Sequence, residues 1–320
     1  MKINDRNIKV WSTIGARATL GMAALQLAEE MDNLMVLTCD VSTSAGLDRY
    51  RKTYPEKYLD LGIAEQNMIG VAAGLASEGF NVITTTFSPF QTMRCLEQIK
   101  VNLGYMKQKV CMVGIASGLA LGTLGFTHCC IEDIGVLRSI PGLSIISPAD
   151  SLETVKALEA AVKFNGPVYI RLTGSSNNPI IYKKDYKFKI GKSITVLDGD
   201  EITIFCNGAT VYHCIEAAKI LSIKNIFCKV VNMHTIKPID KLAIERACKT
   251  SLIVTVEEHN VIGGLGSAVA EYKSSIKNSP KQVILGVQDT YTKGGSYKYL
   301  LKKNRITPLK IAEDILLSRK

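Results

Sequence analysis

The sequence has no long apolar run, no CxxC pair and few prolines. Its 320 residues include 9 prolines and 9 cysteines, and the cysteines are odd in number and irregularly spaced. No apolar stretch approaches the roughly 20 residues that a membrane-crossing helix needs, and the polar residues 1–9 do not have the pattern of a signal peptide. We therefore expect reduced thiols, no membrane span and a location in the cytoplasm.

Histidine is scarce, and charge is not concentrated in one segment. The four histidines share no metal-ligand spacing, so the sequence indicates no metal site in this chain. The net charge of +10 could attract nucleic acid or a membrane, but the lysines are spread through both halves and no recognition motif accompanies them. A solvated surface is the preferred interpretation, and we expect neither partner.

Apolar, strand-like runs alternate with helical patterns along the whole chain. The runs LMVLTCD, NVITTTF, KVCMVGI, LSIISP and PVYIRL are bounded by turn residues and separated by stretches of helix length. A chain of 320 residues that is 47% hydrophobic can bury more than one core. The pattern predicts an α/β protein with two three-layer αβα domains, each with a mostly parallel central sheet.

A polar, basic and proline-containing stretch interrupts this alternation after Gly174. It reads SSNNPIIYKKDYKFKIGK, which suits a connection between two folding units. A second alternation follows it and includes the strand-like run KQVILGV near the C-terminus. We predict a first domain at residues 1–182, a linker at residues 183–192 and a smaller domain at residues 193–320.

Residues 58–76 form the most informative segment, with the sequence YLDLGIAEQNMIGVAAGLA. It predicts a strand that ends at Gly62 and a helix whose first turn contains Glu65. A carboxylate there has a structural explanation, because it stabilises a helix N-terminus by a few tenths to about 1 kcal/mol. Judged by position alone, that explanation is preferred.

Four motifs, however, occur in the order typical of transketolases and cover nearly the whole chain. The first, LGIAEQNMIGVAAGLASEG, is similar to the glutamate motif of the pyrimidine-binding domain, and TFSPFQTMRCLEQIK, GFTHCCIEDIGVLRSIPGLSIISPAD and VTVEEHNVIGGLGSAVAE follow it. The chain thus resembles the C-terminal subunit of a split transketolase, with a pyrimidine-binding domain and a transketolase C-terminal domain. The resemblance implies that Glu65 hydrogen-bonds a pyrimidine ring nitrogen of thiamine diphosphate and promotes the imino form that activates the cofactor.

Four further residues match family positions at the cofactor or the substrate. The resemblance implies that Phe87 and Phe90 stack on the pyrimidine ring and that Asp40 faces the cofactor. It also implies that His128, in GFTHCCIED, contacts the ketose substrate. Without the motifs, core packing would explain the two phenylalanines, a turn or helix cap would explain Asp40, and a structural role would explain His128.

Several positions depart from the pattern of sugar-phosphate transketolases. Leu124 replaces an aspartate four residues before His128, and Ala116 replaces an upstream substrate histidine. Gly174 stands where the family has a phosphate-binding arginine, which leaves Arg171 as the nearest candidate for substrate binding. Because glycine cannot replace a guanidinium fork, a modified, branched or nucleotide-linked sugar is a hypothesis alongside an ordinary aldose acceptor.

The motif that binds the cofactor's diphosphate in transketolases, GDG with a downstream asparagine, does not occur in this sequence. No cluster of oxygen ligands for Mg²⁺ is visible either. The resemblance therefore implies a partner, the N-terminal transketolase subunit, that holds the diphosphate and Mg²⁺ or Ca²⁺. The simplest assembly is a heterotetramer with two-fold symmetry, and the chain alone should be inactive.

The expected reaction is transfer of a two-carbon ketol unit from a ketose donor to an aldose or modified-sugar acceptor. A β subunit of a 2-oxo acid dehydrogenase would share the two-domain plan and an equivalent glutamate, but GFTHCCIED and NMHTIKPID favour the transketolase branch. A non-catalytic scaffold subunit is the other alternative. The presence of Glu65, Phe87, Phe90 and His128 argues against it, whereas the loss of the phosphate-binding arginine at Gly174 keeps it open.

Overall fold

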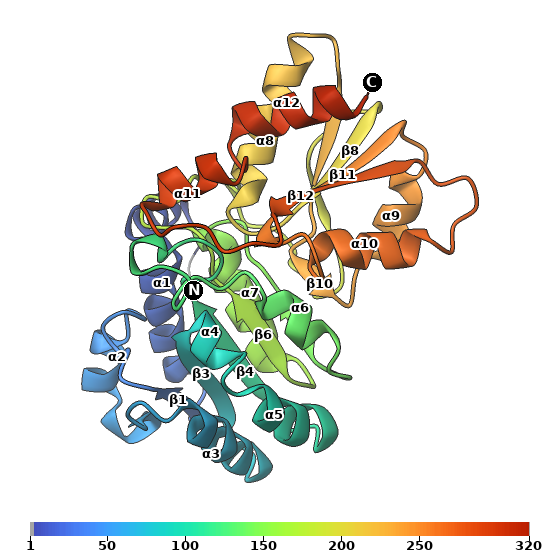
Figure 1. Ribbon diagram of the computed structural model, residues 1–320. Coiled ribbons are helices and arrows are strands. Elements are labelled where there is room, and N and C mark those ends of the chain that lie inside the picture. The colour runs from blue at the N-terminus through green and yellow to red at the C-terminus, as the bar shows by residue number, and fades with distance from the viewer. Residues whose placement is uncertain (1–2, 320) are drawn as a thin grey trace.

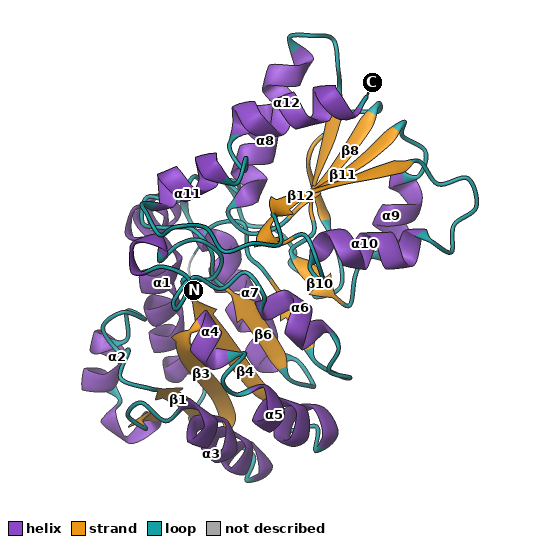
Figure 2. Cartoon of the chain, viewed as in Figure 1, coloured by secondary structure: helices purple, strands orange, loops and turns teal. Residues whose placement is uncertain are grey.

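Two α/β units lie side by side in the structure, a computed structural model that describes residues 3–319. Figure 1 shows the first unit in blue and green and the second in yellow, orange and red. Each unit has a central sheet with helices on both faces, as Figure 2 shows. The sheets have seven and five strands and are mostly parallel, so the predicted fold class is confirmed.

The first sheet is built almost wholly from parallel strands that are buried on both faces. Its strands are β1 (Leu34–Thr38), β2 (Tyr58–Asp60), β3 (Asn81–Phe87), β4 (Val110–Ile115), β5 (Ser144–Ile146), β6 (Val168–Arg171) and β10 (Thr235–Lys237). They follow the order β10-β5-β6-β4-β3-β1-β2, and only the β10–β5 pair is antiparallel. β1, β4, β5 and β6 are buried along their whole length, as helices on both faces require.

Helices cover both faces of this sheet. They are α1 (Asp5–Glu30), α2 (Asp48–Thr53), α3 (Glu65–Ser77), α4 (Ser88–Gln91), α5 (Leu96–Gln98), α6 (Asp133–Arg138) and α7 (Ser151–Lys163), with the short 3-10 helices η1 (Pro55–Lys57) and η3 (Gly122–Leu124) and the π-helix η2 (Ile99–Tyr105). Leu34 and Val36 of β1 point into the core shared with α1 and α7. Met35 and Leu37 point into the core shared with α3, because successive side chains of a strand face opposite sides.

The second unit has a smaller sheet in the order β12-β11-β8-β9-β7, and β7 runs antiparallel to β9. Its core on one face lies under α8 and α12, and its core on the other face lies under α9 and α10. The elements are β7 (Ile194–Leu197), β8 (Ile202–Cys206), α8 (Thr210–Ser222), β9 (Cys228–Asn232), α9 (Lys241–Ala247), β11 (Leu252–Asn260), α10 (Leu265–Lys273), β12 (Lys281–Val287), α11 (Tyr297–Lys303) and α12 (Pro308–Ser318).

The position of β10 departs from the expectation that each domain builds its own sheet. It lies beyond the predicted linker, yet it extends the first sheet, with Thr235 opposite Ile146. The backbone N–H of Ser147 also donates to the carbonyl of His234 at 2.7 Å. The second unit therefore completes the edge of the first sheet, and the two units share backbone hydrogen bonds.

The predicted linker at residues 183–192 contains no helix or strand, and the segment that leads into it is fixed to the first unit. Asp150 caps α7 by accepting the N–H of Glu153 at 2.8 Å. Its second carboxylate oxygen accepts the backbone N–H groups of Ile181 and Tyr182, each at 2.9 Å. One buried carboxylate thus fixes both the start of α7 and the path of the connection.

We predict that the wild type is more stable than Asp150→Asn at low pH and that this difference in the free energy of unfolding shrinks as the pH rises. Burial raises the pKa of Asp150 from 3.8 to about 6. A carboxyl group whose pKa is raised by folding stabilises the fold below its unfolded pKa and loses that contribution as the pH rises through the folded pKa. Urea unfolding at pH 4 and pH 7 should show the gap shrinking by roughly 2 to 3 kcal/mol, and a gap that widens with pH would contradict this.

Candidate functional site

The carboxyl edge of the first sheet gathers most of the residues predicted for the site. Thr38 at the end of β1 pairs with Asp60 of β2 and with Thr85 of β3. Because these strands are parallel and in register, the residues that follow them emerge at one edge of the sheet. Those residues are Asp40 after β1, Glu65 after β2, Phe87 at the end of β3, Phe90 in α4 directly after it, and His128 in the loop after β4.

Glu65 is the first residue of α3 and is only 3% exposed. β2 ends at Asp60 rather than at Gly62, because the Asp60 carboxylate accepts the N–H of Gly62 at 3.0 Å and turns the chain. Glu65 Oε1 pairs with the guanidinium of Arg94 at 2.7 Å, and its Oε2 accepts no hydrogen bond within residues 3–319. The site therefore contains a shielded carboxylate with one oxygen free to accept a ligand.

Phe87, Phe90 and His128 form an aromatic cluster beside this carboxylate. The ring centroid of His128 lies 5.4 Å from that of Phe90 and 6.0 Å from that of Phe87. The two phenylalanine rings are 6.3 Å apart and meet edge to face. The Arg94 guanidinium lies 4.1 Å from the centroid of Phe90, so it joins the cluster to Glu65.

The loop of His128 is closed at its base and held by the second unit. Gly118 and Cys130 exchange backbone hydrogen bonds across the base. Phe126 packs on Tyr291 with ring centroids 5.2 Å apart, and the Tyr291 hydroxyl donates to Glu132 at 2.8 Å. The position of His128 therefore depends on contacts between the two units.

Asp40 is the predicted residue that the structure leaves apart from the cluster. Its φ of 54° places it in the left-handed region, and its backbone N–H donates to Asp60 at 2.9 Å. Its side chain is exposed and makes no hydrogen bond or ion pair within the described part of the chain. It therefore faces outward from the same sheet edge.

The structure contradicts the predicted substrate contact of Arg171. Its side chain is 0% exposed, and its Nε donates to the equally buried Asp133 at 2.8 Å. Its Nη2 donates to the carbonyl of Glu258 on β11 at 2.7 Å. A guanidinium that is enclosed in this way joins the two units and cannot reach a sugar.

Two further residues of β11 fix the boundary between the units. Glu258 accepts the N–H of Leu119, and burial raises the pKa of its carboxyl above the ordinary value. His259 accepts the N–H of Gly135 at Nε2 and bonds the carbonyl of Asn260 through Nδ1. Both residues hold the loops of the first unit in place.

The second unit also contains the glycine-rich turn at residues 263–266, before α10. The carboxylate of Glu257 already accepts the N–H groups of Leu265 and Gly266 at the start of this helix. A Cβ at Gly264 would lie 2.2 Å from that carboxylate. The turn therefore packs closely around an acidic side chain and is not open to a phosphate.

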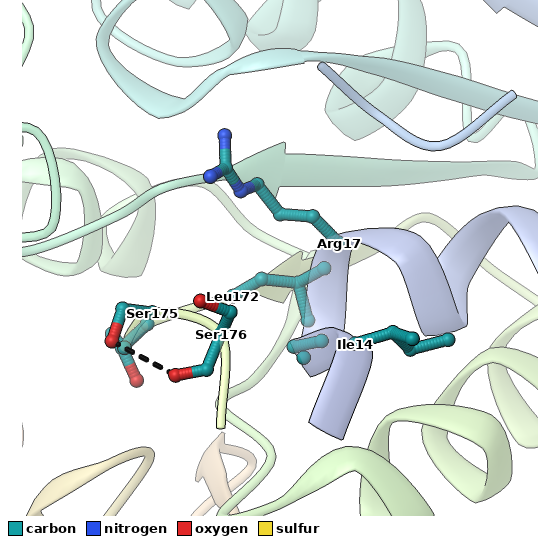
Figure 3. A pocket seen from close by; sticks show the side chains of 9 residues that line it. Ile14, Arg17, Leu172, Ser175 and Ser176 are labelled. Carbon is teal, nitrogen blue, oxygen red and sulfur yellow. Dashed lines mark hydrogen bonds between the residues drawn. The ribbon is translucent and has the colours of Figure 1, made fainter. Parts of the chain in front are cut away.

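Sequence reasoning missed a small cavity beside α1. It has a volume of about 40 Å³ and is lined by residues 14–17 and 172–176. Figure 3 shows Arg17 extending from α1, with Leu172, Ser175 and Ser176 on the neighbouring segment. α1 is interrupted at Gly15, whose φ is 81°, so its longer part begins at this cavity. A helix start leaves backbone N–H groups free for an anion.

Other chemical features are few in residues 3–319. No group of three or more His, Cys, Asp or Glu side chains could hold a metal ion there. The nine cysteines form no disulfide, and eight of them are buried. Within the described part of the chain, none of the helices has the length and apolar character that a membrane crossing requires.

Each of the two units matches a known family of domains. Residues 12–178 match the family described as "Transketolase, pyrimidine binding domain", and residues 191–311 match "Transketolase, C-terminal domain". The chain therefore belongs to the transketolase family, in which it corresponds to the C-terminal subunit of a split transketolase.

The chain is also similar to named transketolase subunits and to a solved transketolase structure. The chain is 38% identical over 279 residues to an apulose-4-phosphate transketolase subunit of Phocaeicola vulgatus, covering 86% of this chain and 88% of the relative. It is 35% identical over 288 residues to a 6-deoxy-6-sulfo-D-fructose transketolase subunit of a Clostridium species, covering 90% and 89%. A solved split-gene transketolase, an inactive β4 tetramer, aligns with a TM-score of 0.86 at 34% identity over 94% of this chain and 96% of that chain.

A pyrimidine-binding domain implies thiamine diphosphate, and the described residues fit the pyrimidine end of that cofactor. Glu65 offers a shielded carboxylate oxygen without a hydrogen-bond partner. The partly buried rings of Phe87 and Phe90 offer surfaces for stacking. The chemistry of these side chains therefore suits a flat heterocycle with a ring nitrogen.

We predict that Arg171→Ala lowers the free energy of unfolding by about 3 to 5 kcal/mol, because it leaves Asp133 buried without a counter-ion. The exposed pair of Arg51 and Asp48 provides a control, and Arg51→Ala should cost less than about 1 kcal/mol. Urea denaturation measures both changes. A substrate-binding role would instead leave the stability of Arg171→Ala unchanged and raise KM in the two-chain enzyme.

Proposed function

We propose that this chain binds the pyrimidine end of thiamine diphosphate in a two-chain transketolase that transfers a two-carbon ketol unit between sugars. The observation that carries this proposal is the position of Glu65, which is 3% exposed at the start of α3 and next to the aromatic cluster. A carboxylate in that setting can form a short, charge-assisted hydrogen bond to a ring nitrogen.

Each residue of the site has one task in this proposal. When bound, thiamine diphosphate supplies the carbon nucleophile that takes up the two-carbon unit. Glu65 holds a proton at the pyrimidine ring nitrogen, and Phe87 and Phe90 orient the ring by stacking. His128, which belongs to the aromatic cluster, hydrogen-bonds the sugar. Asp40 faces the cofactor from the end of β1.

The diphosphate and its Mg²⁺ or Ca²⁺ belong in this proposal to an N-terminal partner subunit. The support is the sequence, which lacks a GDG motif, and the relative from Phocaeicola vulgatus, whose name makes it one of the subunits of its transketolase. A heterotetramer would place the pyrimidine on one chain and the diphosphate on another. The domains at residues 1–182 and 193–320 would then have separate roles, with the second fixing the loop that carries His128.

The acceptor in this proposal is a phosphorylated sugar with a modified or branched skeleton. The cavity beside α1 includes Gly174, where the family has a phosphate-binding arginine, and Arg17 is one of the residues that line it. Within the described residues Arg17 has no acidic partner, so its guanidinium is available to a phosphate. Leu124 is 54% exposed near His128 and offers an apolar contact instead of a carboxylate. The two curated relatives are named for unusual sugars.

We predict that Glu65→Gln lowers kcat of the two-chain complex by roughly a hundredfold or more, because glutamine cannot hold the proton at the ring nitrogen. The fold and the complex should stay intact, as circular dichroism and gel filtration would show. Glu97→Gln changes an exposed glutamate of α5 and should leave kcat unchanged. Near wild-type turnover in Glu65→Gln would refute the assignment.

We also predict that Arg17→Ala raises KM for a phosphorylated acceptor sugar by about ten- to a hundredfold, the effect of losing hydrogen bonds worth about 1.5 to 3 kcal/mol. KM for the same sugar without its phosphate should change little. Arg6→Ala, at an exposed position of the same helix, serves as the control. Equal effects on both sugars would show that Arg17 does not bind the phosphate.

A further inference from the structure

One side chain, Arg94, makes contact with both halves of the proposed pyrimidine site. Its Nη1 lies 2.7 Å from Glu65 Oε1. The carbon of its guanidinium lies 4.1 Å from the ring centroid of Phe90. The Arg94 side chain is 42% exposed, whereas that of Glu65 is 3% exposed. The arginine therefore has room to move toward solvent, and the glutamate does not.

Arg94 contacts the carboxylate of Glu65 and the ring of Phe90. In the proposed function, the aminopyrimidine of the cofactor makes the same two contacts. A guanidinium is a planar cation that donates hydrogen bonds to a carboxylate and stacks on aromatic rings. A pyrimidine that carries a proton on its ring nitrogen is also planar, donates to the same carboxylate and stacks on the same rings. The two groups would bind the same carboxylate and the same ring, so they compete for one subsite.

We infer that Arg94 occupies the pyrimidine subsite while the cofactor is absent, and that it leaves when thiamine diphosphate enters. This inference rests on the proposed function. A shielded carboxylate without a partner is costly, so a substitute cation stabilises the empty site. The same contact lowers the apparent affinity of the free chain, because only the fraction of molecules with Arg94 displaced can bind.

The test uses the full chain without its partner and the free aminopyrimidine half of thiamine, which has neither thiazolium nor phosphates. Calorimetry should show that Arg94→Ala binds this probe about tenfold more tightly than the wild type, the gain expected if Arg94 fills the subsite about nine-tenths of the time. Arg305→Ala is the matched control, because Arg305 is 45% exposed and pairs with Asp314 in the second unit. It should bind the probe as the wild type does.

Equal or weaker binding by Arg94→Ala overturns the inference, and so does the absence of measurable binding by either chain. Arg94→Gln is the second variant, since it keeps a polar side chain and preserves the fold if alanine does not. Thermal unfolding of both variants, compared with that of Arg305→Ala, shows which of them is folded.

The double variant Glu65→Gln/Arg94→Ala separates this inference from the proposed function. The inference predicts that the tighter binding of the probe, seen in Arg94→Ala, disappears in the double variant. The probe then lacks the carboxylate that Arg94 had covered. A gain that persists overturns the inference. If Arg94→Ala gives no gain while Glu65→Gln still abolishes turnover in the complex, the inference fails and the proposed function stands. Full turnover by the complex that contains Glu65→Gln would refute the proposed function itself.

Discussion

A carboxylate that is shielded from water needs a partner, and Glu65 is the residue on which this constraint acts. The edge strand β2, the turn made by Asp60 and the start of α3 bring Glu65 to the carboxyl edge of the sheet. β3, which is separated from β2 by β1, and the following α4 bring the aromatic rings of Phe87 and Phe90 to the same edge. In the free chain the partner is Arg94, and in the proposed enzyme it is a ring nitrogen. The proposed chemistry of the chain depends on this exchange.

The second unit contributes to this site by fixing loops rather than by supplying reacting groups. Arg171, Asp133 and Glu258 form a buried connection between the units. Tyr291 holds the loop that carries His128, and β10 completes the first sheet. Because backbone and side-chain hydrogen bonds cross the boundary, a change in the second unit can move a residue of the proposed substrate site. The two units therefore act as one support for the site.

Much of the fold could be predicted from local patterns. The alternation of strand and helix gave the α/β class, and strands such as β12 coincide with the predicted apolar runs. Glu65, Phe87, Phe90 and His128 lie at or after the carboxyl ends of β2, β3 and β4 in one sheet, and three of the four form one cluster. Three features depend on distant parts of the chain and escaped prediction. β10 has three residues and pairs far along the chain. Arg171 meets its partner 38 residues away, and Arg17 lines one cavity with the turn after β6. No local pattern encodes such pairings.

The most direct test is the structure of the two-chain complex with thiamine diphosphate bound. The account predicts that a carboxylate oxygen of Glu65 lies about 2.6 to 3.0 Å from a pyrimidine ring nitrogen, with the ring against Phe87 or Phe90. A pyrimidine ring located away from Glu65, or a Glu65 carboxylate bonded to another group in the loaded enzyme, would contradict it.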